Sequence, residues 1–399
     1  MRTVAVAVSC AALAVVGLEL SGWPAPKYVH GDFIQYWLAS RALLEGWDPY
    51  DPVVWRAMQV AVVGSDGLIV PGAGFSYPLT TAVAALPFAL VGAAQSAPLW
   101  FVAQTGSAIA GLTTLQRRIG GPSTGRRLGL LLGLGAVMQP VFLFAGEGNI
   151  ARFLPGILSF GLALLGSGRP FAAGSVLGLL VLKPQLFIVF ALVILFVAPS
   201  ARGRLVGGSA ATVATLLAVS LALRPSWIQP WVVQSSHVLG QYGRFNLWGS
   251  LDYGWAAWIV ASVAVVALLV WWRVRRPPLL TAAATALALS LFLAPYAAEY
   301  DQAVLLVCLA AYLAAIAGLS IRTQAVLVVL FVGTSSALWW PAWLGIMSPG
   351  WQNVLPAPAA CLLLVFADSV AGRAPALEPG AGRGALIGRP FSWHGRRGE

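Results

Sequence analysis

The sequence contains few charged residues. Only 9% of its 399 residues are Asp, Glu, Lys or Arg, whereas about a quarter are charged in soluble domains. Hydrophobic residues make up 59%, and apolar runs of roughly 20 residues, the length that crosses a bilayer, recur from end to end. Because these runs are continuously apolar and do not alternate, they exclude a spanning β-barrel. The composition therefore predicts an all-α polytopic membrane protein.

Cysteine is also scarce. Cys10, Cys308 and Cys361 all lie in apolar runs and form no CxxC pair, which argues against a disulfide framework and a zinc site. No phosphate-binding glycine loop, nucleophile elbow or histidine pair at metal-ligand spacing occurs. Glu299 and Asp301 resemble an acidic metal-binding pair, but two carboxylates at this spacing are common. We therefore expect no metal and no cofactor.

Basic residues outnumber acidic ones, giving a formal net charge of +11. Nucleic-acid binding would require basic residues clustered with aromatic ones in a soluble segment, so no nucleic-acid partner is expected. Most arginines instead lie in short loops and a tail that fit one side of a membrane, as in cytoplasmic loops. The remaining loops hold nine of the 13 acidic residues: Asp32, Glu45, Asp48, Asp51, Asp66, Glu147, Asp252, Glu299 and Asp301. This separation predicts one topology, with both termini in the cytoplasm.

The apolar stretches define the expected spans. Residues 4–20 are interpreted as a retained first helix, with a cleaved signal peptide as the alternative. Further stretches occupy 77–94, 97–115, 128–144, 150–166, 170–182, 184–200, 205–223, 254–272, 278–294, 302–319, 323–340 and 353–371. Counting each as a crossing puts the C-terminus on the wrong side, so we interpret 77–94, which contains Pro78 and Pro87, as a re-entrant or interfacial piece leading into one crossing. About twelve transmembrane helices result.

Residues 1–372 then form one membrane domain, and the Gly-, Arg- and Pro-rich residues 373–399 a disordered basic cytoplasmic tail. The first outer loop, 21–76, contains a predicted amphipathic juxtamembrane helix at 32–45 and a weaker one near 53–62. Asp32 is predicted to cap the first helix, with Gln35 completing a capping box. Acidic groups beside a membrane are costly unless water or substrate meets them, so we infer that Asp32 also does chemistry.

Polar segments from distant parts of the chain converge on the predicted outer face. They are 31–51, 146–152, 182–185 and 295–301, joined by an outer loop at 224–253 that carries His237, Arg244, Asn246 and Asp252. Such convergence is typical of a membrane-embedded active site.

Individual residues in these segments allow two interpretations. Lys183 lies between apolar runs, where its ammonium either snorkels at the turn made by Pro184 or binds an anion such as a lipid phosphate. Arg152 raises the same question. The aromatic faces of Tyr36 and Trp37 suit contact with a sugar, but such residues are also ordinary at membrane interfaces.

Residues 32–51 (D-F-I-Q-Y-W-L-A-S-R-A-L-L-E-G-W-D-P-Y-D) resemble the first outer loop of glycosyltransferase family 87. F-S-Y-P-L at 75–79, G-E-G-N at 146–149, L-K-P-Q at 182–185 and P-Y-A-A-E-Y-D at 295–301 follow in the family's order. Glu147 stands where the family usually has Gln. The resemblance spans roughly residues 5–340. The family includes the mycobacterial phosphatidylinositol-mannoside mannosyltransferases. It implies a GT-C-type bundle in the bacterial cytoplasmic membrane.

The same resemblance implies an inverting, metal-independent hexosyltransferase. The donor would be a polyprenyl-phosphate sugar, and the acceptor a lipid or glycan at the outer face. Asp32 would be the general base, and Lys183 and Arg152 are inferred phosphate contacts, with Arg244 or His237 as further candidates. The remaining expected substrate contacts are Tyr36, Trp37, Glu147, Asn149, Gln185, Tyr296, Glu299 and Asp301.

Two other classes of function stay open. A transporter or lipid flippase predicts an inverted repeat and polar residues at mid-membrane, whereas no convincing repeat is present and the acids lie in outer loops. A non-catalytic scaffold of the cell envelope is the second alternative. Neither the sugar, the acceptor nor the oligomeric state follows from the sequence.

Overall fold

The computed structural model describes residues 31–64, 74–120, 124–138, 148–242, 247–337 and 355–371. Every regular element within these ranges is an α-helix or a short 3-10 helix, and none of them is a strand. The all-helical prediction is therefore confirmed for the described part of the chain. The expected first helix at 4–20 and the tail at 373–399 lie outside the described residues.

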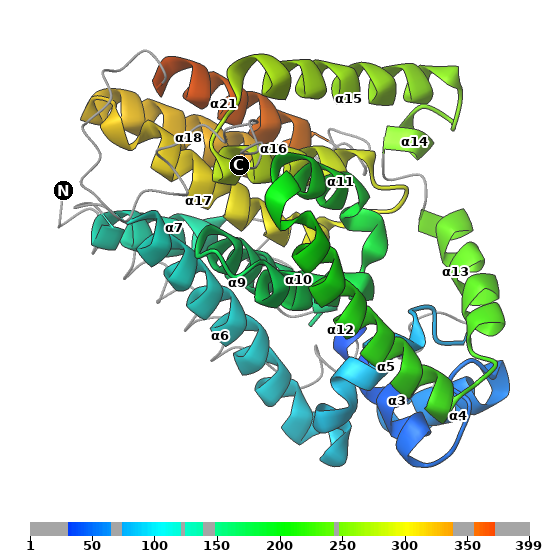
Figure 1. The fold of residues 1–399 in the computed structure, drawn as a ribbon. Helices are drawn as coiled ribbons and strands as arrows, with labels where there is room; N and C mark the ends of the chain where they lie inside the picture. Colours follow the sequence, from blue (N-terminus) through cyan, green and yellow to red (C-terminus); the bar gives the residue numbers. More distant parts are fainter. Residues whose placement is uncertain are drawn as a thin grey trace, which may run out of the picture.

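The elements follow one another in Figure 1. The α-helices are α3 (Asp32–Leu44), α4 (Pro52–Val63), α5 (Leu79–Ala85), α6 (Ala93–Ile119), α7 (Thr124–Val137), α9 (Leu154–Gly166), α10 (Pro170–Leu177), α11 (Ile188–Val197), α12 (Arg202–Leu223), α13 (Ile228–Tyr242), α14 (Leu247–Ser250), α15 (Trp255–Arg275), α16 (Leu279–Leu293), α17 (Leu305–Ala315), α18 (Ile321–Ala337) and α21 (Pro356–Ala371). The 3-10 helices are η2 (Leu86–Leu90), η4 (Ile150–Phe153), η5 (Gly178–Leu182), η6 (Pro184–Leu186), η7 (Pro199–Ala201), η9 (Glu299–Val304) and η10 (Ile316–Gly318).

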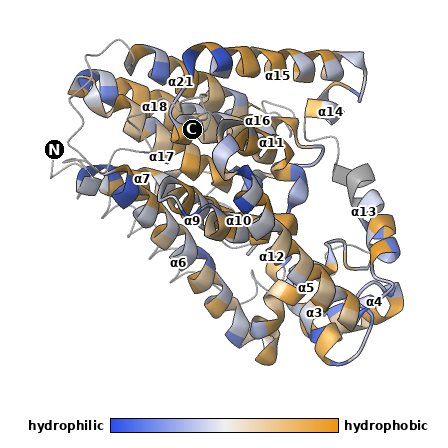
Figure 2. Ribbon diagram, in the orientation of Figure 1, coloured by the Kyte–Doolittle hydropathy of each residue, from blue (hydrophilic) through white to orange (hydrophobic). Residues whose placement is uncertain are grey.

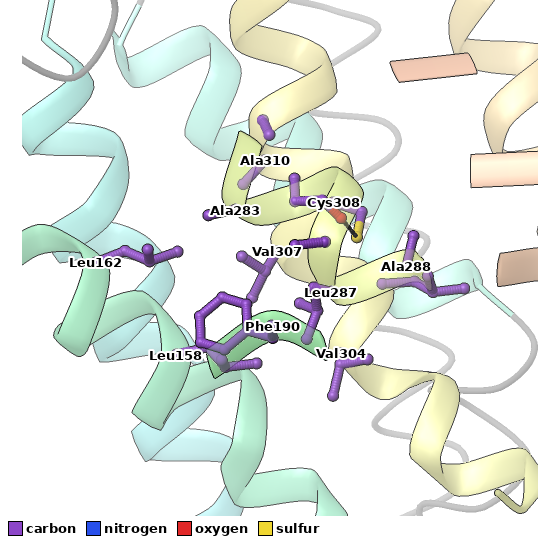
Figure 3. Close-up of a cluster of buried hydrophobic side chains, with 14 of the residues drawn as sticks. Leu158, Leu162, Phe190, Ala283, Leu287, Ala288, Val304, Val307, Cys308 and Ala310 are labelled. Atoms are coloured by element: carbon purple, nitrogen blue, oxygen red, sulfur yellow. Dashed lines mark hydrogen bonds between the residues drawn. The ribbon is translucent and has the colours of Figure 1, made fainter. Parts of the chain in front are cut away.

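A large hydrophobic core joins α9, α10 and α11 to α16, α17 and α21. Figure 3 shows its centre, where Phe190 lies among Leu158, Val307 and Leu287. The middle of α16 is almost entirely small, with alanine at most positions from 282 to 288. Lipid tails are as apolar as leucine side chains, so burying leucine does not drive membrane helices together. Small residues favour their association, because they let the helix backbones approach closely.

A second core surrounds α3. Its aromatic members include Phe33 and Tyr36 of α3, Phe75 of the segment before α5, and Trp100 of α6. Figure 1 shows α3, α4 and α5 together at one end of the molecule and α16, α17, α18 and α21 at the other. Ile150 and Leu182 belong to the second core while their neighbours Ala151 and Leu180 belong to the first. Residues 149–153 and 180–183 therefore lie where the two cores meet.

The predicted helix at 32–45 is present as α3, but its amphipathic character is wrong. Residues 33–40, 42 and 43 are all buried, including Gln35 and Ser40. Helices on several sides, α5, η2 and α6, cover it. Ser40 can be buried because its hydroxyl donates to the Tyr36 carbonyl and lies 2.7 Å from the Ala82 carbonyl of α5.

Two pairs of helices approach until their backbones touch. A Cβ added to Gly208 of α12 would lie 2.0 Å from the carbonyl oxygen of Phe171 in α10, and one added to Gly174 would lie 2.0 Å from that of Leu205. Gly111 of α6 and Gly156 of α9 meet in the same manner. These contacts hold α12 closely against α10, and α6 closely against α9.

Several helices are apolar along most of their length. Pro199–Leu223, Trp255–Arg275 and Tyr300–Gly318 are each long and apolar enough to cross a membrane. Leu79–Leu90 and Ala93–Ile119 pass this test together but are bent by 117°, as expected for a break within 77–115. Figure 2 shows α15 hydrophobic along most of its length and hydrophilic at one end. The chain is thus a multi-pass membrane protein.

Candidate active site

Polar residues gather around Asp32 where the two cores meet. Asp32 is the first residue of α3, and Gly31 occupies the N-cap position with no side-chain cap bond. The prediction that Asp32 caps this helix is therefore wrong. Its carboxylate instead accepts hydrogen bonds from the side-chain amides of Gln35 (Nε2–Oδ1 2.9 Å) and Asn149 (Nδ2–Oδ2 2.6 Å). The N-terminal end of the helix dipole also favours a negative charge at this position.

Asn149 comes to Asp32 from 117 residues further along the chain. It is fully buried and caps η4, because its Oδ1 accepts the N–H of Ala151 at 2.8 Å. The preceding Gly148 has φ +65°, a left-handed conformation that glycine adopts without steric cost. This turn directs the Asn149 side chain back toward α3.

Tyrosine hydroxyls surround the two side chains. Tyr36, one turn after Asp32 on α3, packs edge-on against Tyr77 with ring centroids 4.9 Å apart, and its hydroxyl accepts the Ile150 N–H at 3.4 Å. Tyr77 accepts from Asn149 Nδ2 at 3.3 Å. Burial, reinforced by the charge of Asp32, raises the pKa of both Tyr36 and Tyr77 well above its ordinary value. Both hydroxyls therefore stay protonated and neutral.

A buried ion pair lies beside Asp32. Lys183, between η5 and η6, places Nζ 2.5 Å from Oδ1 of Asp301 in η9, and both side chains are at most 1% exposed. The ammonium also lies 4.5 Å from the ring centroid of Tyr300. The other oxygen of Asp301 accepts the N–H of Ala298 at 2.9 Å. The snorkelling interpretation of Lys183 is therefore wrong, because its charge is neutralised inside the protein.

These surroundings act on Asp32 in opposing directions. Burial raises the pKa of its carboxyl, and the hydrogen bond from Asn149 and the charge of Lys183 lower it. The charge of Asp301 raises it again, and a hydrogen bond with Tyr300 lowers it. Burial is the largest effect, so the pKa of Asp32 ends above its ordinary value. A carboxylate with a raised pKa is a stronger base, provided that the pH is high enough to ionise it.

Four other residues that were predicted to contact substrate are described by the structure, and their burial and partners differ. Tyr296 is half-buried, and its hydroxyl lies 3.3 Å from that of Tyr300. Arg152 of η4 is half-buried with its guanidinium 5.6 Å from the ring centroid of Phe101. Gln185 is half-buried in η6. Trp37 is buried, and its indole N–H donates to the Val91 carbonyl at 3.0 Å, which ties α3 to the end of η2.

Some of the predicted site residues are not among the residues that the structure describes. Glu147, Arg244 and Asn246 fall outside the described residues, as do the side chains of Glu299 and His237. The segment 224–253, expected as a loop, contains α13 and α14.

Two residues of the cluster, Tyr77 and Tyr300, were not predicted as site residues. Both occur in sequence segments that were singled out, F-S-Y-P-L at 75–79 and P-Y-A-A-E-Y-D at 295–301. The segments therefore carried the signal, but no local pattern in them indicates that these two hydroxyls lie beside Asp32. Among the described residues, no three His, Cys, Asp or Glu side chains are grouped so as to hold a metal ion. Within the part of the chain that the structure describes, the cluster offers the Asp32 carboxylate as a base, with neutral hydroxyls and a compensated ion pair around it.

Comparison with protein families gives a match over the middle of the chain. A family model described as glycosyltransferase family 87 matches residues 75–295, more than half of the chain. This range includes Tyr77, Asn149 and Lys183, while Asp32 precedes it and Asp301 follows it. No match was found among the curated proteins or among the solved structures.

Proposed function

The chain belongs to glycosyltransferase family 87, and from this premise we propose that it transfers a hexose from a polyprenyl-phosphate donor to a lipid or glycan acceptor. Membership of the family makes the chain a membrane glycosyltransferase; the donor, the acceptor and the residue roles are the proposal. One observation carries the assignment of the site. Asp32 is a carboxylate with a raised pKa, bonded to Asn149 and close enough to Lys183 and Asp301 to be affected by their charges.

In the proposed reaction Asp32 takes the proton of an acceptor hydroxyl. The hydroxyl oxygen forms a bond to the anomeric carbon while the bond from that carbon to the phosphate oxygen breaks, and the polyprenyl phosphate leaves with the electron pair. The configuration at the anomeric carbon is inverted. A carboxylate has about four lone-pair positions, and Gln35, Asn149 and Tyr300 occupy three on Asp32. About one position is left for the acceptor hydroxyl.

The leaving phosphate gains negative charge in the transition state, so nearby cations stabilise it. Arg152, a half-buried cation whose guanidinium lies over the Phe101 ring, takes this role as a direct contact. Lys183 already has Asp301 as its counterion. Its contact with phosphate would require the donor to displace Asp301, and the ion pair is therefore the weaker candidate. Tyr296 and Gln185, both half-buried, are the proposed contacts to sugar hydroxyls, together with Glu299 and Glu147.

The proposed setting is the cytoplasmic membrane of a bacterium, crossed about twelve times, with the active site on the outer face. The arginines of the short loops support this orientation. Arg202 and Arg204 at the start of α12 and Arg273 and Arg275 at the end of α15 flank apolar helices on one predicted side. The juxtamembrane position of α3 is part of the same proposal. A mannosyl donor is one candidate, suggested by the resemblance to the mannoside-forming members.

The test is transfer of radiolabelled hexose from polyprenyl-phosphate donors to a native lipid extract by the purified protein. Asp32→Asn keeps the shape of the side chain and removes the base, so the rate should fall by about 100- to 10,000-fold, the usual contribution of a general base. Asp51→Asn is the matched control. Asp51 is exposed and only caps α4, a task that Asn performs as well as Asp.

Equal transfer by the parent and Asp32→Asn would refute the role of Asp32. If neither protein used any donor, and a substrate gradient drove uptake into vesicles that contain the protein, the transporter alternative would replace the proposal.

A further inference from the structure

Asn149 was expected to touch substrate, but all of its side-chain bonds lie within the protein. Its two N–H donors point to Asp32 Oδ2 (2.6 Å) and Tyr77 Oη (3.3 Å), and its oxygen accepts from Ala151 (2.8 Å). The side chain is 0% exposed. An amide has only two donors, so none remains for a sugar hydroxyl.

The orientation of this amide is fixed by its surroundings. The Ala151 N–H is a donor and must face the amide oxygen, which forces the NH₂ group toward Asp32. The main chain at this point is anchored by α6. Trp100 donates its indole N–H to the Gly148 carbonyl at 2.7 Å, and Gln104 donates to the Asn149 carbonyl at 2.7 Å. Both anchoring side chains are at most 1% exposed.

We propose that Asn149 is a positioning residue that fixes the orientation of the Asp32 carboxylate and stabilises its ionised form, with α6 as its anchor. This rests on the proposed role of Asp32 as general base. The chemical reason is that a hydrogen bond donated to a carboxylate favours the charged form. Without the hydrogen bond from Asn149, burial raises the pKa of Asp32 further, so the base becomes ionised only at a higher pH.

The other groups around Asp32 stay in place in this comparison. Lys183 and Asp301, from the η5–η6 turn and η9, carry opposite charges and form a pair. Tyr36, Tyr77 and Tyr300, from α3, the segment before α5, and η9, are neutral hydroxyls. Gln35 donates to the other oxygen of Asp32. None of these groups depends on the Asn149 amide for its charge.

The experiment measures kcat/KM against pH for the purified protein and two Asn149 variants. Asn149→Ser retains a side chain that can cap η4 but is too short to repeat the bond to Asp32, and the acid limb of the profile should move up by about one pH unit. Asn149→Asp retains the shape and the cap but places a second carboxyl against Asp32. Its acid limb should move further up, because neighbouring carboxylates resist simultaneous ionisation. In both variants activity should recover as the pH is raised.

A separate pair of variants tests the anchor. Gln104→Leu removes the bond to the Asn149 carbonyl and should lower kcat with little change in KM. Gln116→Leu is the control, because Gln116 is an equally buried glutamine of α6 whose bonds go to Ala310 and Arg127, away from the site. Its kcat should stay close to that of the parent, because the bonds of Gln116 do not reach the site.

The outcomes separate this inference from the proposed function. If Asp32→Asn is inactive and both Asn149 variants lose activity equally at every pH, Asn149 is only structural and the inference is overturned. A raised KM with an unmoved acid limb would overturn it in favour of substrate binding. If Asp32→Asn retains full activity, the proposed function itself fails, whatever the Asn149 profiles show.

Discussion

At the scale of single residues, the pair of Lys183 and Asp301 is costly to disturb one partner at a time. Both side chains are at most 1% exposed, with Nζ and Oδ1 2.5 Å apart. Removing one partner of such a pair leaves a buried charge without compensation, which costs about 3–5 kcal/mol, whereas removing both is often nearly neutral. Each of the two charges is therefore tolerated in the interior only because the other charge lies beside it.

We therefore expect Lys183→Met and Asp301→Asn each to lower the thermal stability of the detergent-solubilised protein strongly, and the double variant to recover most of the loss. Thermal unfolding followed by tryptophan fluorescence measures this. Arg41→Met and Glu45→Gln are the control cycle, because that ion pair is on the surface and exposed pairs contribute about 0–1 kcal/mol. Additive losses in the Lys183–Asp301 cycle would show that the two charges do not compensate each other.

Single residues were easier to identify from the sequence than their partners. Asp32, Asn149, Lys183 and Asp301 were all predicted as site residues, because polar groups in so apolar a chain are conspicuous. The bond between Lys183 and Asp301 spans 118 residues, and no local pattern encodes such a contact. The cap at Asp32 failed by one residue for a related reason. Gly31 and Asp32 are both acceptable N-caps, and the Asp32 carboxylate bonds to the side chains of Gln35 and Asn149.

At the scale of helices, the sequence predicted the extents well and the burial of faces poorly. The predicted helix at 32–45 ends one residue earlier, as Asp32–Leu44, and Pro87 lies in the first turn of η2, directly after α5 ends at Ala85. Proline and glycine act locally, so their effects can be predicted from the sequence alone. The amphipathic interpretation of α3 failed because Gln35 and Ser40 found partners on Asp32 and Ala82. A polar residue marks an exposed face only when no partner covers it.

The contact between α10 and α12 gives a prediction at this scale. Gly208→Ala would place a methyl group against the Phe171 carbonyl, so the helices must separate, and we expect a loss of about 1–3 kcal/mol in stability, as for overpacked cores. The neighbouring Gly207→Ala is the matched control, because its Cβ would meet only the Phe171 ring at 3.9 Å. Both variants gain the same helix propensity. Thermal unfolding of the two proteins in one detergent compares them, and equal midpoints would contradict the close contact.

At the scale of the whole molecule, the arrangement of two cores explains how the site is built. The core around α3 and the core around α16 and α17 meet at residues 149–153 and 180–183, and the polar side chains of Asn149 and Lys183 come from these segments. The convergence of 31–51, 146–152, 182–185 and 295–301 was predicted from charge topology alone. In the described residues Asp32 bonds to Asn149 and Lys183 to Asp301, and the charges of Lys183 and Asp301 act on Asp32, so the segments do come together. Their position at the outer face stays a prediction. Helix bends and 3-10 turns that bring them into contact depend on tertiary packing and could not be predicted.

The orientation of the molecule in the membrane is the last prediction. Glu45, at the end of α3, is expected outside, and Arg322, at the start of α18, inside; both are exposed. In a chain whose three native cysteines are replaced, Glu45→Cys should react with a membrane-impermeant maleimide in intact cells, and Arg322→Cys should react only in inverted membrane vesicles. Both should react equally in detergent, which controls for accessibility. Labelling of Arg322→Cys in intact cells would reverse the topology and place Asp32 on the cytoplasmic side, where a polyprenyl-phosphate donor presented at the outer face could not reach it.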